Sequence, residues 1–472
     1  MSNISSLGNM GIQNSYSASV KNADTKAISQ NTSDQVSISS KGEEYVSGEL
    51  LIKFKGNAPE QFAITKGGAS AEIVKKFDIP ASDRAVNGEL CHVKLDGITV
   101  EKALGELSKN KSVEYAEPNF IYRVPEDKDV STETSTKKGK TKENEPNDLH
   151  SNLWGLKNEG QTGGTVGADI SAVDAWKIGT GKREGGALVA VIDTGIDTSH
   201  PDLKNNLWTN PGEIPGDGID NDGNGYIDDV HGFNFARKTG DPADDHSHGT
   251  HCSGTIAAQG NNAEGIVGVN WDANVMGLKF LGPGYGSLSD AVEAIEYATK
   301  MGVDVTSNSW GGGPYSQALS DAISGFPGLF IAAAGNDSSD NDIRPTYPAS
   351  YKLPNVISVA STDANDQLST FSNFGQKSVD IAAPGTKIYS TIPGGQYALK
   401  SGTSMACPHV AGVAALIMST FPELPVADVK AAILRGSDKL ENLDGTVAGS
   451  RRLNAEKAMK SAGRRAAKLA KE

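Results

Sequence analysis

The sequence predicts an α/β protein built around a parallel sheet, with a smaller α+β unit before it. Two segments of the larger part carry this prediction. Residues 187–192 form an almost wholly apolar run of strand length, which is typical of a central parallel strand covered on both faces. Residues 410–421 form a longer apolar stretch, which predicts a buried helix. Since 472 residues exceed one ordinary hydrophobic core, we expect two or more domains.

The smaller unit is expected over residues 44–124. Residues 48–54 alternate as a strand does, and residues 112–116 predict another strand. Between them, apolar residues lie at the spacing of a helix, at Val100, Ala103, Leu104 and Leu107. This pattern predicts a compact α+β unit.

Three further segments are predicted from their composition. Residues 1–43 are rich in Ser, Asn, Gln and Thr and poor in aromatic residues, which predicts disorder. Residues 125–146 are charged and rich in Lys, Glu and Thr, which suits a cleavable linker. Residues 459–472 are basic, and we interpret them as a solvated helix end, with attachment to an anionic surface as the alternative.

Ser404 lies at the start of the predicted apolar helix. At a helix N-terminus, free backbone N–H groups and the helix dipole favour developing negative charge. Pro408 is compatible with this position, because amides of the first turn have no partner within the helix. Ser404 is therefore either an ordinary N-cap or a nucleophile, and the choice depends on whether a base and a carboxylate accompany it.

Two other residues supply those groups. Asp193 follows the apolar run 187–192, and α/β sheets place their active sites at the carboxyl ends of such strands. His248 begins a predicted helix of small residues. Alone, each residue has an ordinary interpretation, as a turn aspartate and a turn histidine. Together with Ser404 they form the set of an orienting carboxylate, a general base and a nucleophile.

The three motifs around these residues resemble the active-site signatures of subtilisin-like serine proteases. They are Asp-Thr-Gly at 193–195, His-Gly-Thr-His at 248–251 and Gly-Thr-Ser-Met-Ala at 402–406, in the order of that family. The resemblance extends over residues 147–458. It implies a three-layer α/β/α sandwich with a mainly parallel sheet, and a serine endopeptidase that works through an acyl-enzyme.

The same resemblance implies further site residues. Residues 332–336 resemble the strand end whose asparagine completes the oxyanion hole, here Asn336, although Gly-Asn also favours a plain turn. Two glycine-containing segments resemble those that hold a substrate peptide as an added strand: Gly284, Tyr285 and Gly286, and Ser309, Trp310 and Gly311. Tyr285 and Trp310 either line outer pockets or pack against each other. Thr346 matches the base of the primary pocket and carries no charge, which suggests broad specificity for uncharged side chains.

An acidic loop predicts a calcium site. Oxygen-bearing side chains at 220, 222 and 224, glycine at 225 and aspartate at 228 reproduce most of an EF-hand-type loop. The twelfth position is His231 instead of glutamate, so the closing ligand must come from elsewhere; a surface turn is the alternative. The expected ligands are Asp217, Asp220, Asp222, Asn224, Asp228 and Asp229.

A second calcium site is implied by the resemblance alone, with Asp148, Asp202 and Asn262 as ligands. We therefore expect two or more structural Ca²⁺ ions. A zinc cluster of His246, His248 and His251 is the rival interpretation, and it conflicts with the use of His248 as a base.

The unit at 44–124 resembles the inhibitory propeptide of the same family. The expected partners are therefore polypeptide substrates and the chain's own propeptide, in a monomer; the processing position within 125–148 stays open. A net charge of −14 argues against nucleic acid as a main partner. No apolar segment that resembles a signal peptide or a membrane span is present. The layout favours action outside the cell by a leaderless route, with the cytoplasm as the alternative.

Two rival functions remain. One is an inactive relative that serves as a binding protein, and the other is a narrow intracellular processing enzyme. The three cysteines, Cys91, Cys252 and Cys407, cannot all pair with one another.

Overall fold

A computed structural model describes residues 36–60, 62–65, 68–80, 88–126, 128–132 and 145–472. The predictions for residues 1–35 and 133–144 lie outside these ranges. The helices are α1 (Val100–Leu107), α2 (Ala172–Ala175), α3 (His248–Ala257), α4 (Leu288–Lys300), α5 (Gln317–Gly325), α6 (Thr403–Thr420), α7 (Val426–Arg435) and α8 (Ala455–Leu469), with short 3₁₀ turns at Glu441–Leu443 and Ala448–Ser450. We call residues 36–126 the N-terminal unit and residues 145–472 the main domain.

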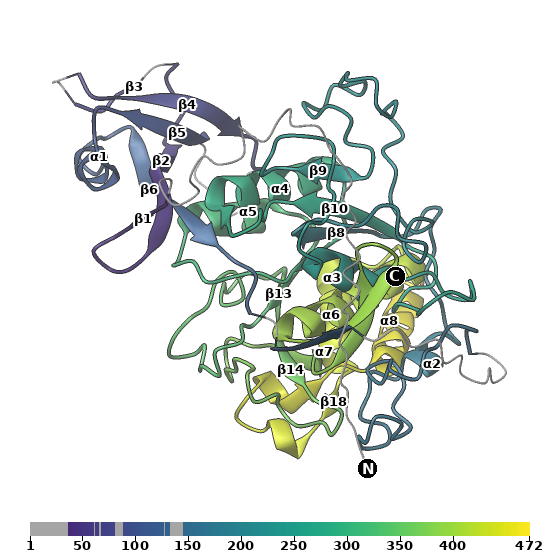
Figure 1. Cartoon of the computed structure of the whole chain (residues 1–472). Helices are drawn as coiled ribbons and strands as arrows, with labels where there is room; N and C mark the ends of the chain where they lie inside the picture. Colours follow the sequence, from purple (N-terminus) through teal and green to yellow (C-terminus); the bar gives the residue numbers. More distant parts are fainter. Residues whose placement is uncertain (1–35, 61, 66–67, 81–87, 127, 133–144) are drawn as a thin grey trace, which may run out of the picture.

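The N-terminal unit is an antiparallel sheet with one helix (Figure 1). Its strands are β1 (Val36–Ile38), β2 (Glu44–Phe54), β3 (Phe62–Ala63), β4 (Ser70–Phe77), β5 (Leu90–Asp96) and β6 (Val113–Tyr122). Helix α1 begins after Thr99, whose side chain accepts a hydrogen bond from the Lys102 amide, and it buries Val100, Ala103 and Leu107. The helix forms because these apolar residues recur on one face.

The main domain contains a nine-stranded sheet in the order β18-β19-β15-β14-β13-β12-β8-β10-β9, and its central pairs are parallel. The strands are β8 (Leu188–Asp193), β9 (Gly232–Asn234), β10 (Asn274–Lys279), β12 (Val305–Asn308), β13 (Leu329–Ala333), β14 (Val356–Thr362), β15 (Ile381–Pro384), β18 (Asp438–Lys439) and β19 (Arg451–Arg452). All six residues of β8 are buried, as the apolar run predicted.

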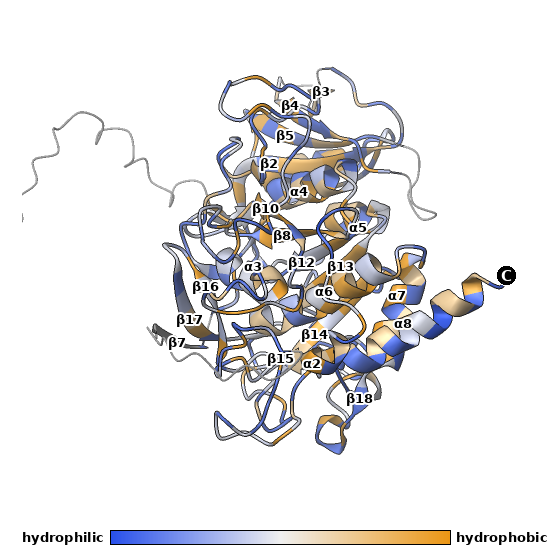
Figure 2. Ribbon diagram, turned by 90° about the vertical axis from the view of Figure 1, so that its right-hand side faces the viewer, coloured by the Kyte–Doolittle hydropathy of each residue, from blue (hydrophilic) through white to orange (hydrophobic). Residues whose placement is uncertain are grey.

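Helices cover both faces of this sheet. Alternate side chains of β8 point to opposite faces: Val189 and Val191 pack with α3 and α6, and Ala190 and Ile192 pack with α4 and α5. The predicted three-layer α/β/α architecture is confirmed. Helix α6 lies in the middle of one layer, where Figure 2 shows its apolar residues. It is long and apolar enough to cross a membrane, but 83 % of it is buried inside this fold.

A strand of the main domain joins the N-terminal sheet. Strand β11 (Gly286–Ser287) pairs antiparallel with the end of β6, so the two sheets are connected through backbone hydrogen bonds. Figure 1 shows the N-terminal unit beside α4 and α5 as a result. The core of the N-terminal unit is continuous with the apolar layer beneath these two helices.

Two segments differ from what their composition predicted. Strand β1 lies within the segment predicted to be disordered, because it pairs with the free edge of β2. Strand β7 (Lys128–Thr132) lies within the predicted linker and pairs with β17 (Gln396–Ser401), which itself pairs with β16 (Ile388–Ile392). Composition describes side chains, whereas these strands form through the backbone groups of an available edge.

The basic C-terminal segment forms the end of a helix that packs on the main domain. Residues 459–469 belong to α8, which buries Met459, Ala462 and Ala466 and lies beside α7. Its basic residues stay on the exposed side, so the amphipathic spacing fits a helix packed on the domain.

Candidate active site

Asp193 and His248 meet at the carboxyl end of β8. The His248 Nδ1–H donates to Asp193 Oδ1 over 2.7 Å, and the same oxygen accepts the Thr194 amide over 2.7 Å. Both side chains are fully buried. Gly249 permits the close approach, since a Cβ at that position would lie 2.1 Å from the Gly195 carbonyl oxygen. The contact with Asp193 places the imidazole proton on Nδ1 and directs Nε2 away from the carboxylate.

Ser404 is the second residue of α6, so its amide belongs to the first turn and has no acceptor within the helix. Its hydroxyl donates to the Ser309 carbonyl oxygen over 3.4 Å. Cys252, one turn along α3 from His248, links Ser404 to the pair. Its Sγ donates to the Ser404 carbonyl over 3.5 Å, and it lies within 4.8 Å of the nearest ligand atoms of Asp193 and His248. The structure thus brings the three predicted residues to one place.

Asn336 follows the end of β13 and is held by the residue before Ser404. Its Oδ1 accepts hydrogen bonds from the Thr403 amide and hydroxyl, each over 2.9 Å. These two donors fix the orientation of the amide, and Nδ2 donates to the carbonyl oxygen of Glu126 over 3.2 Å. Gly335 has a φ of +112°, and a Cβ there would lie 2.4 Å from Asn373 Nδ2. Glycine is therefore required beside Asn336.

The two glycine-containing segments hold residues of the N-terminal unit between them. Gly286 pairs with Tyr122 through β11. Gly311 exchanges two backbone hydrogen bonds with Arg123, of 3.1 and 3.0 Å. Trp310 is fully buried, and its ring packs edge-on against Tyr122 with 5.3 Å between centroids. This part of the chain therefore lies as an added strand between the segments.

The remaining residues of these segments have different surroundings. The Gly284 carbonyl accepts a hydrogen bond from the Arg123 guanidinium over 3.1 Å. Ser309 Oγ donates to the Ser404 carbonyl over 3.0 Å. Tyr285 is half-buried, and among the described residues no ring contact joins it to Trp310. The ring of Trp310 is instead enclosed by Tyr122, Phe280 and Phe330.

Thr346 lies between the segment that contains Gly311 and the segment that contains Gly335. Its methyl carbon would lie 3.5 Å from a Cβ at Gly311 and 3.6 Å from one at Gly335. Its hydroxyl donates to Asn341 Oδ1 over 3.2 Å and accepts from Asn373 Nδ2 over 3.3 Å. The base of the predicted primary pocket is therefore polar and uncharged. Sequence reasoning missed Asn341 and Asn373, which no local motif marks.

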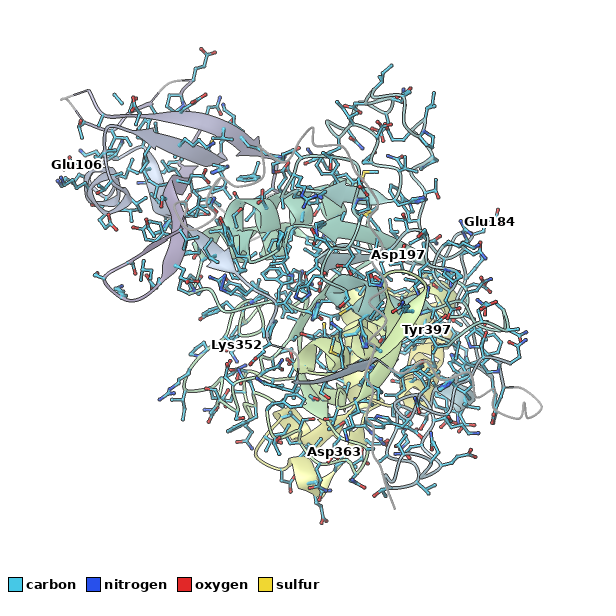
Figure 3. The ribbon with its side chains drawn as sticks, in the orientation of Figure 1. Glu106, Glu184, Asp197, Lys352, Asp363 and Tyr397 are labelled. Atoms are coloured by element: carbon cyan, nitrogen blue, oxygen red, sulfur yellow. The ribbon has the colours of Figure 1, made fainter. Side chains whose placement is uncertain are left out.

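The three expected ligands of the second calcium site, Asp148, Asp202 and Asn262, lie close together near the start of the main domain. Asn262 links them, since its amide donates to Asp148 Oδ2 over 2.8 Å and its Nδ2 donates to Asp202 Oδ1 over 2.7 Å. Asp202 Oδ2 accepts a hydrogen bond from the Tyr397 hydroxyl over 3.1 Å (Figure 3 labels Tyr397). Asp148 Oδ1 is buried and has no hydrogen-bond partner within the described ranges. A buried carboxylate oxygen without a donor fits a cation ligand.

Burial affects the ionisation of both carboxylates at this site. It raises the pKa of Asp202 to about 7, with a further contribution from Asp148, and burial also raises the pKa of Asp148. Without a nearby cation, two buried carboxylates disfavour each other's charge. A bound divalent cation reverses this effect, so this set of oxygens fits Ca²⁺.

The acidic loop brings Asp220 and Asp222 together with Glu213, and one oxygen of each lies within 4.8 Å of the others. Glu213 lies outside the EF-hand-type pattern and was missed. It faces the loop, because its Oε1 accepts the Asn221 amide over 2.8 Å and its Oε2 accepts the Asp228 amide over 3.1 Å. Three convergent carboxylates are a donor set that suits Ca²⁺.

The other expected ligands of the loop make hydrogen bonds of their own. The Asp228 carboxylate accepts the amides of Gly216 and Gly218, over 2.7 and 3.1 Å. Asp229 accepts hydrogen bonds from Tyr297, Asn210 and Asn224. The Asp217 carboxylate accepts the Ile219 amide, and Asn224 Oδ1 accepts the Tyr226 amide. In this structure Asp217, Asp228 and Asp229 shape the loop, whereas Asn224 also contacts the three-carboxylate cluster, since its Nδ2 donates to Asp222 Oδ2 over 3.1 Å.

Comparison with known proteins places both parts of the chain in known families. Residues 184–453 match the subtilase family, and residues 31–119 match the fervidolysin N-terminal prodomain. The chain is 33 % identical over 399 residues to the thermophilic serine proteinase of Bacillus sp. (strain AK1), which covers 83 % of this chain and 82 % of that protein. It is 38 % identical over 294 residues to thermitase of Thermoactinomyces vulgaris, with coverage of 61 % and 93 %.

A solved structure shares the fold. The crystal structure of fervidolysin from Fervidobacterium pennivorans, a keratinolytic enzyme related to subtilisin, aligns with a TM-score of 0.65 at 24 % identity. The alignment covers 90 % of this chain but 62 % of the fervidolysin chain, so the chain spans less than two thirds of it. Taken with the matched family and the relatives, this fold leads to one conclusion: the chain belongs to the subtilase family of serine peptidases, with an N-terminal prodomain.

Proposed function

We propose that this subtilase is a calcium-stabilised endopeptidase made as a precursor that its own prodomain inhibits. The observation that carries this proposal is the buried 2.7 Å contact between His248 Nδ1 and Asp193 Oδ1, beside the helix end that presents Ser404. A carboxylate that fixes the imidazole tautomer leaves Nε2 as the acceptor for the serine proton.

The reaction then follows from the positions of the groups. Ser404 Oγ attacks the carbonyl carbon of the substrate while His248 Nε2 takes its proton, and Asp193 stabilises the resulting imidazolium. Asn336 Nδ2 and the Ser404 amide donate to the oxyanion of the tetrahedral intermediate. The imidazolium gives its proton to the leaving amine, and water then releases the acyl group by the reverse sequence of proton transfers.

Inhibition by the prodomain is supported by side chains that cap two helices of the main domain. The Glu117 carboxylate accepts hydrogen bonds from the Gln317 and Ala318 amides, each over 3.0 Å, at the start of α5. Asn119 Oδ1 accepts the Ser289 amide over 2.9 Å at the start of α4. Donor groups at a helix N-terminus favour such acceptors, so these contacts give the prodomain a defined position.

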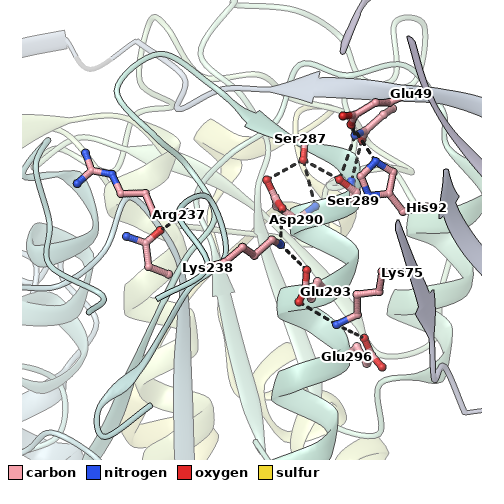
Figure 4. Close-up of polar contacts among 12 residues, drawn as sticks. Glu49, Lys75, His92, Arg237, Lys238, Ser287, Ser289, Asp290, Glu293 and Glu296 are labelled. Carbon is pink, nitrogen blue, oxygen red and sulfur yellow. Dashed lines mark hydrogen bonds and ion pairs between the residues drawn. The ribbon is translucent and has the colours of Figure 1, made fainter. Parts of the chain in front are cut away.

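Charged residues strengthen the same interface (Figure 4). Lys75 of the prodomain lies between Glu293 and Glu296 of α4, at 2.8 and 3.3 Å. Both glutamates are nearly buried, so these ion pairs are screened less than surface pairs. The prodomain then reaches the site itself, since the Glu126 carbonyl occupies the donor of Asn336.

The proposed oxyanion role is tested by Asn336→Leu. We expect the kcat for a chromogenic peptide to fall about 10²–10³-fold while KM changes little, because the amide acts on the transition state. The measurement is steady-state kinetics of the mature enzyme. Asn365→Leu, which replaces an exposed asparagine away from the site, is the control. A fall of less than tenfold in Asn336→Leu would refute the role.

Calcium is proposed for the site at Asp148 and Asp202 and for the cluster at Glu213. The ions would cancel the repulsion between buried carboxylates and hold the surrounding loops to the domain. Stabilisation by a bound ligand is about 2.7 kcal/mol when its concentration is a hundredfold above Kd. In a domain of this size, whose unfolding entropy is about 0.7 kcal/mol/K, that corresponds to a shift in Tm of about 4 °C for each ion.

We therefore expect a chelator to lower the Tm of the mature enzyme by that amount, measured by scanning calorimetry. Asp202→Asn should begin with a lower Tm and respond less to the chelator. Asp174→Asn, at an exposed position on α2, should respond as the wild type does. An identical Tm with and without chelator would contradict the calcium assignment.

Action outside the producing cell stays a prediction from the precursor layout.

A further inference from the structure

Lys279 is a charged side chain buried next to the triad, and neither the motifs nor the proposed reaction uses it. It is the last residue of β10 and lies opposite Asp193 in the parallel pairing of β10 with β8. Val191 and Val275, two and four residues earlier in these strands, lie in the apolar layer beside α3, so alternation places both charged side chains on that face. The exposed fraction of Lys279 is 0 %. A lysine is almost never fully buried unless its ammonium is paired.

The ammonium of Lys279 contacts the two segments that carry the acid and the base of the triad. Its Nζ donates to the Thr194 carbonyl oxygen, in the turn directly after Asp193. It also donates to Asp245 Oδ1 over 2.7 Å, in the loop that leads to His248. One buried cation therefore joins the turn to the loop.

Thr194 connects this contact to the carboxylate and the imidazole. Its amide donates to Asp193 Oδ1 over 2.7 Å, and the same oxygen accepts the His248 Nδ1–H. Its hydroxyl accepts the Gly249 amide over 2.9 Å, directly after His248. A shift of Thr194 would therefore move a donor of the carboxylate and a support of the imidazole together.

A second bridge limits the size of the effect. The Asp244 carboxylate accepts the Thr194 hydroxyl and the Ser247 amide, each over 2.9 Å, so it joins the same turn to the same loop without Lys279. Loss of the ammonium should therefore loosen the geometry without abolishing it. A misplacement of about 1 Å in an active site can cost about 10²-fold in rate, which sets the upper bound of the expected loss.

We propose that Lys279 is a positioning residue of the triad, whose ammonium holds the turn after Asp193 against the loop before His248. This inference rests on the proposed serine-protease function and adds a residue that acts through the acid and the base. A role in folding alone gives a different expectation, since an apolar side chain of similar volume often replaces a buried ion pair without loss of stability. Asp245 is 35 % exposed and pairs with Arg237 at 3.3 Å, so it keeps water and a counter-charge when Lys279 is replaced.

Lys279→Met tests the proposal, because methionine is also long and unbranched but has no donor. We expect the kcat of the mature enzyme for a chromogenic peptide to fall about 10–100-fold, with KM within about threefold of wild type. Steady-state kinetics are measured well below the Tm of the variant, which scanning calorimetry supplies. A kcat within about threefold of wild type would overturn the proposal.

Lys430→Met is the matched control. The Lys430 ammonium also donates to two backbone carbonyls, those of Pro354 and Val356, but at the opposite end of the sheet, where β14 begins. Its replacement should keep kcat within about twofold of wild type, whatever it does to Tm.

Asp245→Ala tests the same link from its partly exposed end, and it serves if Lys279→Met does not fold. It removes one of the two anchors of the ammonium, so kcat should fall about 3–10-fold while KM stays close to wild type. An unchanged kcat in Asp245→Ala would contradict the positioning role.

Coupling to Asp193 separates positioning from any other effect. The rate of self-cleavage, by which the precursor removes its prodomain, is compared in four full-length chains: wild type, Lys279→Met, Asp193→Asn and the double variant. If Lys279 acts through the carboxylate, its replacement should slow the wild type about 10–100-fold but the Asp193→Asn chain less than about threefold. Equal factors in both backgrounds would overturn the inference.

Failure of the inference is distinguishable from failure of the proposed function. A wild type that hydrolyses the peptide beside a Lys279→Met variant of equal kcat would leave the protease function intact and refute the positioning role. A wild type that hydrolyses no peptide would refute both.

Discussion

The Ser404→Ala precursor is expected to remain whole and to hydrolyse no added peptide. Its first-order rate of self-cleavage should fall by about 10⁶-fold, the loss that follows removal of the nucleophile in subtilisin. The reason is geometric, since Ser404 is the hydroxyl presented at the first turn of α6 and linked through Cys252 to the His248 and Asp193 pair. The measurement is the fraction of intact precursor over time, by denaturing gel and mass spectrometry.

The change should leave folding intact, because the Ser404 hydroxyl makes one long hydrogen bond of 3.4 Å. Its Tm should therefore stay close to that of the wild-type precursor. Ser437→Ala, at the end of α7 and away from the site, is the matched control and should mature at the normal rate. If Ser404→Ala and wild type cleave at the same rate, the nucleophile lies elsewhere.

Asp193→Asn is expected to slow self-cleavage by about 10⁴-fold. Asp193 Oδ1 accepts two donors, the His248 Nδ1–H and the Thr194 amide. A carboxamide can turn its NH₂ group toward Nδ1, which moves the imidazole proton to Nε2 and removes the base. It also loses the negative charge that stabilises the imidazolium.

The check is the self-cleavage rate of Asp193→Asn beside Asp197→Asn, which changes another aspartate near the end of the same strand. Asp197 caps a turn through the Ser199 amide, and its replacement should leave the rate within about threefold. A loss below tenfold in Asp193→Asn would show that the carboxylate does not orient the base.

Much of the fold was predictable, because its strongest signals are local. The apolar run 187–192 predicted β8, and the small residues after His248 and Ser404 predicted helices that pack closely. The candidate triad could be predicted for the same reason, because each residue lies next to the end of a helix or strand that the sequence marks. Asn336 could be predicted only from its motif, since its hydrogen-bond partner Thr403 lies 67 residues away in the sequence.

Other features depend on contacts that no local pattern records. Glu213 reaches the acidic loop from outside it, so only the folded chain identifies it. Trp310 packs on Tyr122, which belongs to another domain and lies far away in the sequence. Strands β1 and β7 form because neighbouring edges are free, and edge availability is a property of the assembled sheet.

The pairing of β6 with β11 joins prodomain and main domain in one sheet, through only two residue pairs, Gly286 with Tyr122 and Ser287 with Ile121. While the chain is whole, the prodomain cannot diffuse away, so these bonds act together with the contacts of Glu117, Asn119 and Lys75 to hold it on the main domain. After cleavage the same contact becomes an equilibrium between two molecules, and its occupancy depends on their concentration. Dilution of the cleaved protein is then expected to open the site, whereas the uncleaved precursor stays inhibited at any concentration.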